Sequence, residues 1–272
     1  MVDDVARHYS AGGDLAARIA ERLQAAGKDI AALTTADLAA VDEFHIRGRQ
    51  ATLELARSLN LSAGSHVLDI GSGLGGPART LAETFGCHVT GIDLTPAFCE
   101  AAAALSGWVG LGGLTTFQQG DATSLPFPDR TFDAAMTIHV AMNIARKDLM
   151  YAEARRVLRP GARFGVYDVL QGEGGQVHFP VPWAREPAIS HLATDAQMRR
   201  LLADSGFNIL DVVDSTEQST AWFEAMAERL AQKAPPVTFR AFLGDDFVDM
   251  TRNQVRNLRE RRIRTVRYVC QA

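Results

Sequence analysis

Short apolar runs alternate with segments of helical spacing along most of the chain. Seven of these runs are the length of a strand, at about His66–Ile70, His88–Ile92, Thr115–Gln118, Phe132–Ile138, Arg163–Val169, Phe207–Val213 and Ile263–Cys270. Parallel strands need crossover connections, which are usually helical. The repeated strand and helix units therefore predict an α/β fold, with a seven-stranded, mostly parallel sheet covered by helices on both faces.

Helix boundaries within this pattern follow from proline, glycine and capping residues. One helix is expected to begin near Pro77, bury Ala78, Leu81, Ala82 and Phe85, and end at Gly86. A second is expected over Lys147–Leu158, with Arg159, Pro160 and Gly161 as its stop, and a third over Thr194–Ala203. These helices supply the crossovers that a parallel sheet needs.

Helical segments also precede the sheet and interrupt its last two strands. The alanine-rich stretch from Leu15 to about Leu59 has helical spacing broken near Gly27 and Gly48, and we expect it to form a lid. Roughly 50 residues before the last strand are mostly helical by pattern, and we expect an insertion that caps the core or forms a homodimer. The predicted division is a lid over 1–60, a core over 61–214, a cap over 215–262 and a final core strand over 263–272.

Composition narrows the class of partner. The 272 residues carry a formal net charge of −4, with a pI near 6.0, which argues against nucleic acid as a partner and favours a small molecule. The cysteines, Cys87, Cys99 and Cys270, are odd in number and widely spaced, so neither a disulfide framework nor a zinc cluster is indicated. No apolar run approaches the roughly 20 residues of a spanning helix, and we expect a cytoplasmic protein without membrane insertion.

A glycine turn follows the first predicted strand. The stretch VLDIGSGLGG places Gly71, Gly73 and Gly76 in a GxGxxG spacing between that strand and the next helix. Glycine lets the backbone approach a ligand closely, and the helix N-terminus directs its amides into the same space. The spacing alone is also compatible with an ordinary tight turn or with a nicotinamide cofactor, so it predicts only a nucleotide-like site.

Three carboxylates end successive strands. Asp69, Asp93 and Asp121 close the first, second and third strands, and should lie along the carboxyl edge, where open α/β sheets bind ligands. Asp93 could accept both hydroxyls of an adenosine ribose, Asp121 an adenine amino group, and Asp69 could favour a cationic ligand. Each acid alone could equally be a turn or cap residue. Together they favour a cationic adenosine cofactor.

With these motifs placed, the chain resembles the class I S-adenosylmethionine-dependent methyltransferases. The resemblance rests on VLDIGSGLGG, TGIDLT, GDATSLPFPDRTFDAAMTIHV and RVLRPGARFGVYDV, and spans about Phe44 to Leu210. The chain is most similar to the small-molecule branch of ubiquinone/menaquinone-type and glycine, sarcosine and dimethylglycine methyltransferases. Residues 42–48, DEFHIRG, are similar to a segment of the sarcosine-type enzymes that precedes the glycine motif.

The resemblance implies a Rossmann-like core that binds S-adenosyl-L-methionine. It places the cofactor's methionine part beside Gly71, Gly73 and Gly75, its ribose on Asp93, and its adenine against Leu94 with the amino group near Asp121 and Ala122. Asp69 matches the acidic position of the motif, and His45 and His139 complete the expected cofactor set. An N-terminal tyrosine lies near the transferred methyl group in related small-amine enzymes, which makes Tyr9 a candidate.

Candidate catalytic residues follow the fourth and fifth strands. A sulfonium methyl is already electrophilic, so the enzyme must mainly align a nucleophile, exclude water and remove a proton where needed. His139 is the leading general base or positioning residue, beside Met142 and Asn143. Tyr167 and Asp168 end the fifth strand at the same edge and could orient a substrate. Each could instead be an ordinary strand-end residue.

Residues near 171–193, which we call the acceptor loop, are expected to wall the substrate pocket. Trp183 could face an apolar or cationic acceptor and Arg185 could pair with a carboxylate, although a hydrophobic loop anchor explains the same pattern. His178 and His191 are further candidates, and the histidines have no acidic motif that would indicate a metal site. The one charge cluster is predicted to be a solvated helix face and strand: Arg252, Arg256, Arg259, Arg261, Arg262, Arg264 and Arg267.

The sequence thus predicts an enzyme that transfers methyl groups to N, O or acidic C of a small molecule. A nicotinamide-dependent oxidoreductase and a non-catalytic adenosylmethionine-binding protein are the alternatives. The oxidoreductase fits less well than a methyltransferase, because its fingerprint strand usually begins the domain and lacks a carboxylate directly before the turn.

Overall fold

The seven predicted strands pair into one sheet. The computed structural model describes residues 14–232 and 246–272, so the candidate Tyr9 lies outside the described residues. Neighbouring strands follow the order β3-β2-β1-β4-β5-β7-β6. The strands are β1 (His66–Ile70), β2 (His88–Asp93), β3 (Thr115–Gln119), β4 (Phe132–Ile138), β5 (Leu158–Gln171), β6 (Asn208–Asp214) and β7 (Ile263–Gln271).

All strands except β7 run parallel. Strand β7 pairs antiparallel with both β5 and β6, and so lies between them. Strand β1 lies between β2 and β4, which is where the strand order reverses along the sheet. In open α/β sheets such a reversal opens a ligand-binding crevice at the carboxyl ends of the strands. The predicted mostly parallel, seven-stranded α/β sheet is therefore confirmed, and its topology locates the site at the end of β1.

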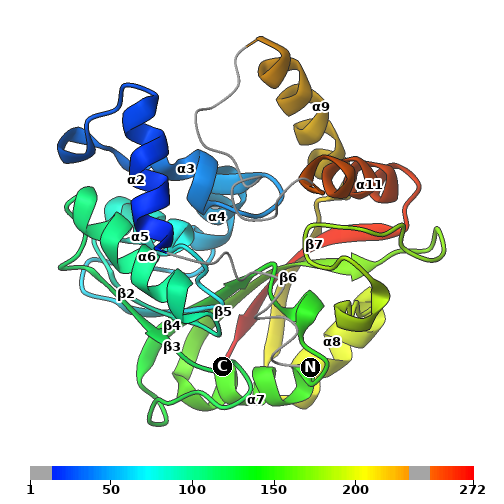
Figure 1. Cartoon of the computed structure of the whole chain (residues 1–272). Helices are drawn as coiled ribbons and strands as arrows, with labels where there is room; N and C mark the ends of the chain where they lie inside the picture. Colours follow the sequence, from blue (N-terminus) through cyan, green and yellow to red (C-terminus); the bar gives the residue numbers. More distant parts are fainter. Residues whose placement is uncertain (1–13, 233–245) are drawn as a thin grey trace.

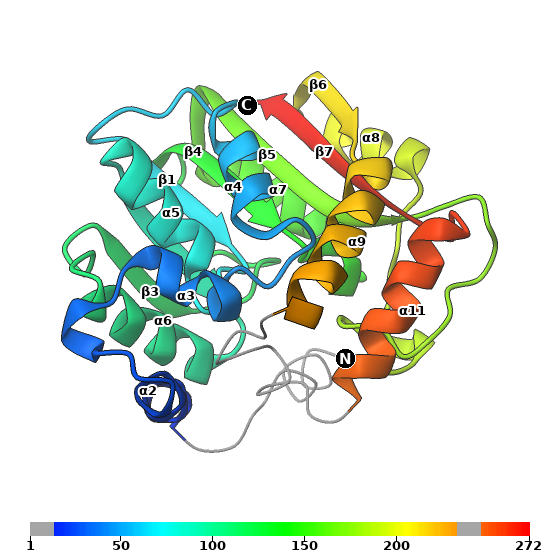
Figure 2. The same cartoon turned by 90° about the horizontal axis from the view of Figure 1, so that it is seen from above.

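Helices cover both faces of the sheet. Figure 1 shows α7 and α8 on one side and the N-terminal helices with α5 and α6 on the other. Figure 2 shows α9 and α11 together, apart from α5 and α6. The α-helices are α2 (Leu15–Ala25), α3 (Thr35–Asp42), α4 (Gly48–Ala56), α5 (Gly76–Phe85), α6 (Pro96–Trp108), α7 (Lys147–Val157), α8 (Asp195–Asp204), α9 (Thr216–Gln232) and α11 (Phe247–Arg259), with short 3-10 helices η1 (Ile30–Ala32), η2 (Ala141–Asn143) and η3 (Pro187–Ile189).

The helix boundaries have local causes. Thr194 caps α8 in a capping box with Gln197, and Pro77 lies in the first turn of α5.

The fifth strand is longer than its apolar pattern predicts, because it begins at Leu158 directly after α7. Residues 159–161, predicted as a helix stop, lie within this strand, where a bulge separates the Phe132 and Ala134 pairings.

Helix α4, which comes from the segment predicted as a lid, is part of the core. Ala51, Leu55 and Leu59 are buried against the same face of the sheet as α5. The close approach depends on Gly165 in β5, where a Cβ atom would lie 2.7 Å from Leu55 Cδ1 and 3.1 Å from Leu59 Cδ2. Helix α2 packs separately on α6, through Leu15, Ile19 and Leu23.

We expect Gly165→Ala to destabilise the protein by about 1–3 kcal/mol, because the added methyl group overpacks the α4 contact. Urea unfolding would measure the change. Gly107→Ala is the matched control, since a Cβ there meets nothing within 4 Å, and it should be neutral or slightly stabilising. If α4 causes the effect, adding Leu55→Ala should cost less in Gly165→Ala than in wild type. Equal costs would contradict this packing.

The part of the chain that the structure describes holds no helix with both the length and the apolar character needed to cross a bilayer. The three cysteines are free and buried.

Candidate active site

The glycine turn leaves one open approach to the backbone. Gly71 and Ser72 donate N–H bonds to the Ile92 carbonyl, at 2.8 and 3.0 Å. A Cβ on Gly71 would lie 2.3 Å from Val140 Cγ2, so this side of the turn is filled. Gly73 has φ +52, and a Cβ there would meet no heavy atom within 4 Å. A ligand can therefore approach the backbone at Gly73, where a side chain would otherwise project.

Asp93 fastens the turn from the end of β2. Its carboxylate accepts N–H bonds from Gly73 and Thr95, both at 2.9 Å. Burial raises the pKa of this carboxyl group, and these hydrogen bonds oppose the rise. Leu94 is half-buried beside it, and its carbonyl accepts a bond from the Gln119 amide. Asp93 thus orders the turn and presents a carboxylate at the sheet edge.

The third carboxylate lies on the neighbouring strand connection. Strands β2 and β3 pair so that Asp93 lies opposite Gln119, two residues before Asp121. One oxygen of Asp121 accepts both the N–H and the hydroxyl of Thr123, each at 2.8 Å. Ala122 is half-buried and packs against the core under the sheet. The three acids end adjacent strands at one edge, in the arrangement that the sequence predicts.

Asp69 is a buried acid at the end of β1. It is 1% exposed, and among residues 14–232 and 246–272 its Oδ2 has no hydrogen-bond partner. Burial raises its pKa to about 8, and the nearby Glu43 and Asp93 charges add to the rise. A cation would lower the cost of ionising this group.

Glu43 and Asp42 are site residues that the sequence-based assignment missed. Glu43 accepts hydroxyl bonds from Thr80 (2.7 Å) and Thr52 (2.8 Å), and burial raises its pKa. Asp42 forms a buried ion pair with Arg79 at 2.6 Å, and burial raises its pKa to about 6. The available signal was a pair of adjacent acids at the end of an apolar helix.

Arg79 connects this acid pair to the glycine turn. Its Nη2 donates to Asp42 and, at 2.5 Å, to the Leu74 carbonyl, while Nη1 donates to the Ala102 carbonyl at 3.1 Å. A Cβ on Gly76 would lie 2.3 Å from the Asp42 carbonyl oxygen. The N-terminal segment therefore packs directly against the turn and holds its shape.

His139, His45 and Tyr167 form a buried ring cluster. The His139 ring centroid lies 5.1 Å from that of Tyr167 and 5.9 Å from that of His45. The His139 Nε2 is buried and has no partner within the described ranges, and burial holds the pKa of His139 well below its usual value. His139 also has φ +54, a strained conformation for a non-glycine residue and one that clusters at functional sites.

His45 connects this ring cluster to the buried acids. Its Nε2 lies 2.9 Å from the Gly48 carbonyl, 3.2 Å from Thr52 Oγ1 and 3.6 Å from Glu43 Oε2. Burial lowers its pKa to about 4. His45 is thus a neutral ring between the acid near the turn and the candidate base.

Tyr167 is 2% exposed and its hydroxyl oxygen lies 3.4 Å from Ser219 Oγ of α9. Burial raises its pKa. Its phenol is therefore protonated at neutral pH.

Asp168 orders the loop after β4. Its Oδ2 accepts the Ala141 N–H and its Oδ1 accepts the Val169 N–H, both at 2.7 Å. Burial raises its pKa to about 6. These contacts give Asp168 a structural function, because both oxygens bind backbone.

The remaining predicted acceptor residues separate into two groups. Met142 and Trp183 are buried in one apolar cluster, and Asn143 and His191 bond to backbone beside them. His178 instead lies 3.0 Å from Glu260 at the end of α11, and Arg185 pairs with Asp246 at 3.1 Å. The structure therefore brings the first group to the His139 segment and places the second at the two ends of α11.

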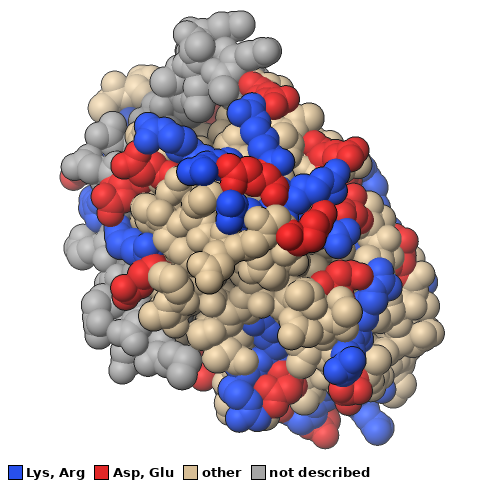
Figure 3. All heavy atoms as spheres, turned by 90° about the vertical axis from the view of Figure 1, so that its right-hand side faces the viewer, with Lys and Arg blue, Asp and Glu red and all other residues tan. Residues whose placement is uncertain are grey.

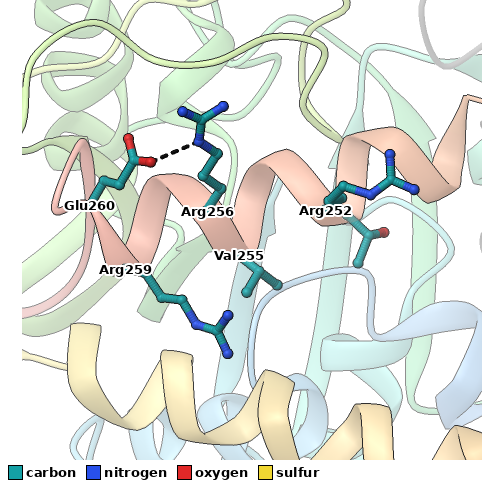
Figure 4. Close-up of a pocket in the computed structure, with 6 residues that line it drawn as sticks. Arg252, Val255, Arg256, Arg259 and Glu260 are labelled. Atoms are coloured by element: carbon teal, nitrogen blue, oxygen red, sulfur yellow. Dashed lines mark hydrogen bonds and ion pairs between the residues drawn. The ribbon is translucent and has the colours of Figure 1, made fainter.

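The arginine cluster is an ion-paired and mostly exposed surface, in which Arg267 is the most buried member. Figure 3 shows basic and acidic side chains interleaved over one face. A surface groove of about 380 Å³ follows α11, lined by Val255 and arginines, and Figure 4 shows Arg256 bonded to Glu260 there. All seven arginines pair with carboxylates: Arg252 with Asp249, Arg256 and Arg262 with Glu260, Arg259 with Glu224, Arg261 with Glu217, Arg264 with Asp214 and Arg267 with Asp211. This neutralisation makes the groove a poor anion site.

Within the two described stretches, no group of three or more His, Cys, Asp or Glu side chains could hold a metal ion.

Comparisons with known proteins show which family the chain is similar to. A family model described as a methyltransferase domain matches residues 68–166. A sterol 24-C-methyltransferase from Gibberella zeae is 40% identical over 116 residues, which cover 43% of this chain and 30% of that protein. An O-methyltransferase from Aspergillus sclerotiorum is 30% identical over 183 residues, covering 65% of this chain and 68% of that protein. The chain therefore matches less than a third of the sterol enzyme but two thirds of the O-methyltransferase.

Among solved structures, the (4+2)-cyclase SpnF superposes with a TM-score of 0.67 at 27% identity. The match covers 82% of this chain and 80% of that protein. The fold is thus shared with a protein named for a different reaction.

Proposed function

Because the chain belongs to the class I S-adenosylmethionine-dependent methyltransferases, we propose that it transfers a methyl group from S-adenosylmethionine to a small-molecule acceptor. The methylated atom would be a nitrogen, an oxygen or an acidic carbon. When bound, this cofactor supplies an electrophilic methyl group on a sulfonium. The proposal rests on one observation: among the described residues, 14–232 and 246–272, the buried atoms Asp69 Oδ2 and His139 Nε2 have no hydrogen-bond partner, and they lie at the carboxyl ends of neighbouring strands β1 and β4.

The residues at the glycine turn fit such a cofactor. Gly73 offers open backbone, and Asp69 is a buried acid whose ionised form a cation would stabilise. We propose that Asp69 and residues 71–75 hold the methionine part and that Asp93 binds the ribose. Leu94, with Asp121 and Ala122, would hold the adenine.

The remaining groups support proton removal and exclusion of water. Burial lowers the pKa of His139, so its ring is neutral at neutral pH and carries an unprotonated nitrogen, but the same burial makes it a weaker base than an exposed histidine. The neutral His45 and the protonated Tyr167 flank it without placing a charge beside it. We propose that His139 is the general base, or the positioning residue where the acceptor is already deprotonated.

Asp93→Ala should weaken binding of S-adenosylhomocysteine about 100-fold or more, because it removes a half-buried carboxylate and the acceptor that orders Gly73. Calorimetric titration measures this affinity. Asp129→Ala is the control, because Asp129 lies on the surface beside Arg156. An unchanged affinity in Asp93→Ala, or no binding to wild type, would reject the cofactor assignment.

Methyl transfer itself is tested by following S-adenosylhomocysteine release with four acceptor probes. These are sarcosine, catechol, acetylacetone and desmosterol, which present an amine, a phenol, an acidic carbon and a sterol alkene. The relatives named for sterol C-methylation and O-methylation differ in the acceptor atom, so the panel covers both. Release that depends on sarcosine, catechol or acetylacetone supports the proposal, whereas release with desmosterol alone would support methyl transfer but to an alkene carbon.

The same panel separates methyl transfer from the alternatives, none of which releases S-adenosylhomocysteine. The likeness to a (4+2)-cyclase supports a second candidate function, in which the cofactor stays intact while an acceptor cyclises. A non-catalytic binder would bind the cofactor without turnover. A nicotinamide oxidoreductase would show a spectral change with the reduced nicotinamide.

We further propose that the enzyme works in the cytoplasm, where its three buried free thiols match a reducing compartment. Helices α9 and α11 are the proposed surface for a homodimer. Analytical ultracentrifugation would test this assembly. The acidic net charge argues against nucleic acid as a partner.

A further inference from the structure

The acceptor loop folds tightly on itself beside η2. Val181 and Ala184 exchange backbone N–H bonds with each other's carbonyls at 2.8 and 3.0 Å. The indole Nε1 of Trp183 donates to Ser190 Oγ at 3.0 Å, and the Trp183 side chain is 1% exposed. Residues 181–191 therefore form a compact unit whose position depends on what attaches it to the core.

Asn143 makes the first attachment. Its side-chain amide nitrogen donates to the Trp183 carbonyl at 2.8 Å and to the Ile189 carbonyl at 2.9 Å. One amide group thus joins two points of the loop that are six residues apart. Beside it, the His191 N–H donates to the Met142 carbonyl at 2.7 Å.

Lys147 makes the second attachment. It is the first residue of α7 and 6% exposed, and its Nζ donates to the Ile144 carbonyl at 2.7 Å and to the His191 carbonyl. Burying a lysine without a bonded carboxylate is costly, so these carbonyls are the compensating partners. Burial lowers its pKa to about 8, and the Asp168 charge opposes this.

Both attachments reach the segment that carries His139. Asn143 and Lys147 follow His139 by four and eight residues, and Asp168 holds the same segment through the Ala141 N–H. The loop and the candidate base are therefore bonded to one short stretch of chain.

We propose that Asn143 and Lys147 form a loop clamp that positions the acceptor loop relative to His139 and so determines affinity for the methyl acceptor. The inference rests on the proposed function, because it assigns the loop to the acceptor. Neither residue is proposed to touch the reacting atoms, so both act as positioning residues.

The test replaces the clamp donors and measures loop exchange and kinetics. Asn143→Asp keeps the shape but removes both N–H donors, and Lys147→Met keeps the apolar stem without the ammonium. Asn253→Asp is the matched control, because the Asn253 amide donates to the Pro180 carbonyl of the same loop at 3.0 Å, outside the clamp. Thermal unfolding checks that each variant folds.

We expect amide hydrogen exchange over residues 181–191 to accelerate at least tenfold in both clamp variants and not in Asn253→Asp. With the probe that turns over fastest in the panel above, KM should rise about tenfold. S-adenosylhomocysteine affinity should stay within twofold.

Unchanged exchange in both variants would overturn the clamp. So would faster exchange with an unchanged KM. Should wild type turn over no probe, the proposed function fails, while the exchange measurement still decides whether Asn143 and Lys147 hold the loop.

Discussion

His139→Asn should lower kcat about 10²- to 10⁴-fold while S-adenosylhomocysteine affinity stays within twofold. Asparagine tolerates the left-handed backbone that His139 adopts, so the variant should fold, but its amide cannot accept a proton at neutral pH. The rate of S-adenosylhomocysteine release under saturating probe would measure this. The expected loss is large because the Nε2 of His139 is buried in the ring cluster with His45 and Tyr167, and no described group bonds it.

His45→Asn provides the comparison for this experiment. His45 bonds the Gly48 carbonyl and Thr52, so its replacement should affect packing and stability more than proton transfer. A kcat in His139→Asn within threefold of wild type would exclude His139 as the general base. Equal losses of cofactor affinity and turnover would instead assign it to cofactor binding.

Asp69→Asn should remove a pH dependence from both cofactor affinity and stability. For binding, the wild-type affinity for S-adenosylmethionine should rise with pH up to about pH 8, because a cation binds the ionised form of Asp69 and its pKa is raised to about 8. The slope should approach tenfold per pH unit below that value. Asp69→Asn should bind at least about tenfold more weakly at pH 8 and lose this slope. Calorimetric titration from pH 6 to pH 9 would measure both.

The same substitution should also change the pH dependence of stability, which in the wild type has the opposite sign to the pH dependence of binding. In the unfolded chain Asp69 ionises near 3.8, whereas in the folded protein it keeps its proton to about pH 8. The unfolded state therefore binds fewer protons between these values, and stability falls as pH rises, by up to about 1.4 kcal/mol per pH unit from this one group. Asp69→Asn should remove this fall, and so be more stable than wild type near pH 8.

Urea unfolding at a series of pH values would compare the two slopes. Asp129→Asn is the surface control, because Asp129 pairs with Arg156 at an exposed position. Asp42 and Glu43 also have raised pKa values, so only the difference between wild type and Asp69→Asn reports on Asp69. Identical slopes in both proteins would show that Asp69 is ionised in the folded state at neutral pH.

Much of the sheet and of the proposed cofactor site can be predicted from the local sequence. The apolar runs located all seven strands to within a few residues, except that β5 begins five residues earlier than predicted, at Leu158. Asp69, Asp93 and Asp121 lie at one edge because parallel strands end together, which is a property of the topology and not of distant contacts. The left-handed backbone of Gly73 is local as well, because it belongs to the turn.

The acid pair before the turn shows what local reasoning missed. In the sequence, Asp42 and Glu43 are typical of the polar end of a helix. In the structure both are buried, and they accept hydrogen bonds from Arg79 and Thr80, which follow nearly 40 residues later. The arginine cluster shows the converse. The carboxylates that pair with these arginines lie on α9, on β6 and along or just after α11. The pattern of one segment alone could not show that every arginine has a carboxylate partner.

The sequence by itself determined the α/β class, the strand positions and the glycine turn, because each depends on residues close together in the chain. The row of three carboxylates could also be predicted, because parallel strands end at the same edge of a sheet. The tertiary structure alone decided which predicted residues share a site. It placed His45, His139 and Tyr167 in one cluster, from three separate elements. It also separated His178 and Arg185 from them, because burial and pairing depend on packing between segments that local periodicity cannot specify.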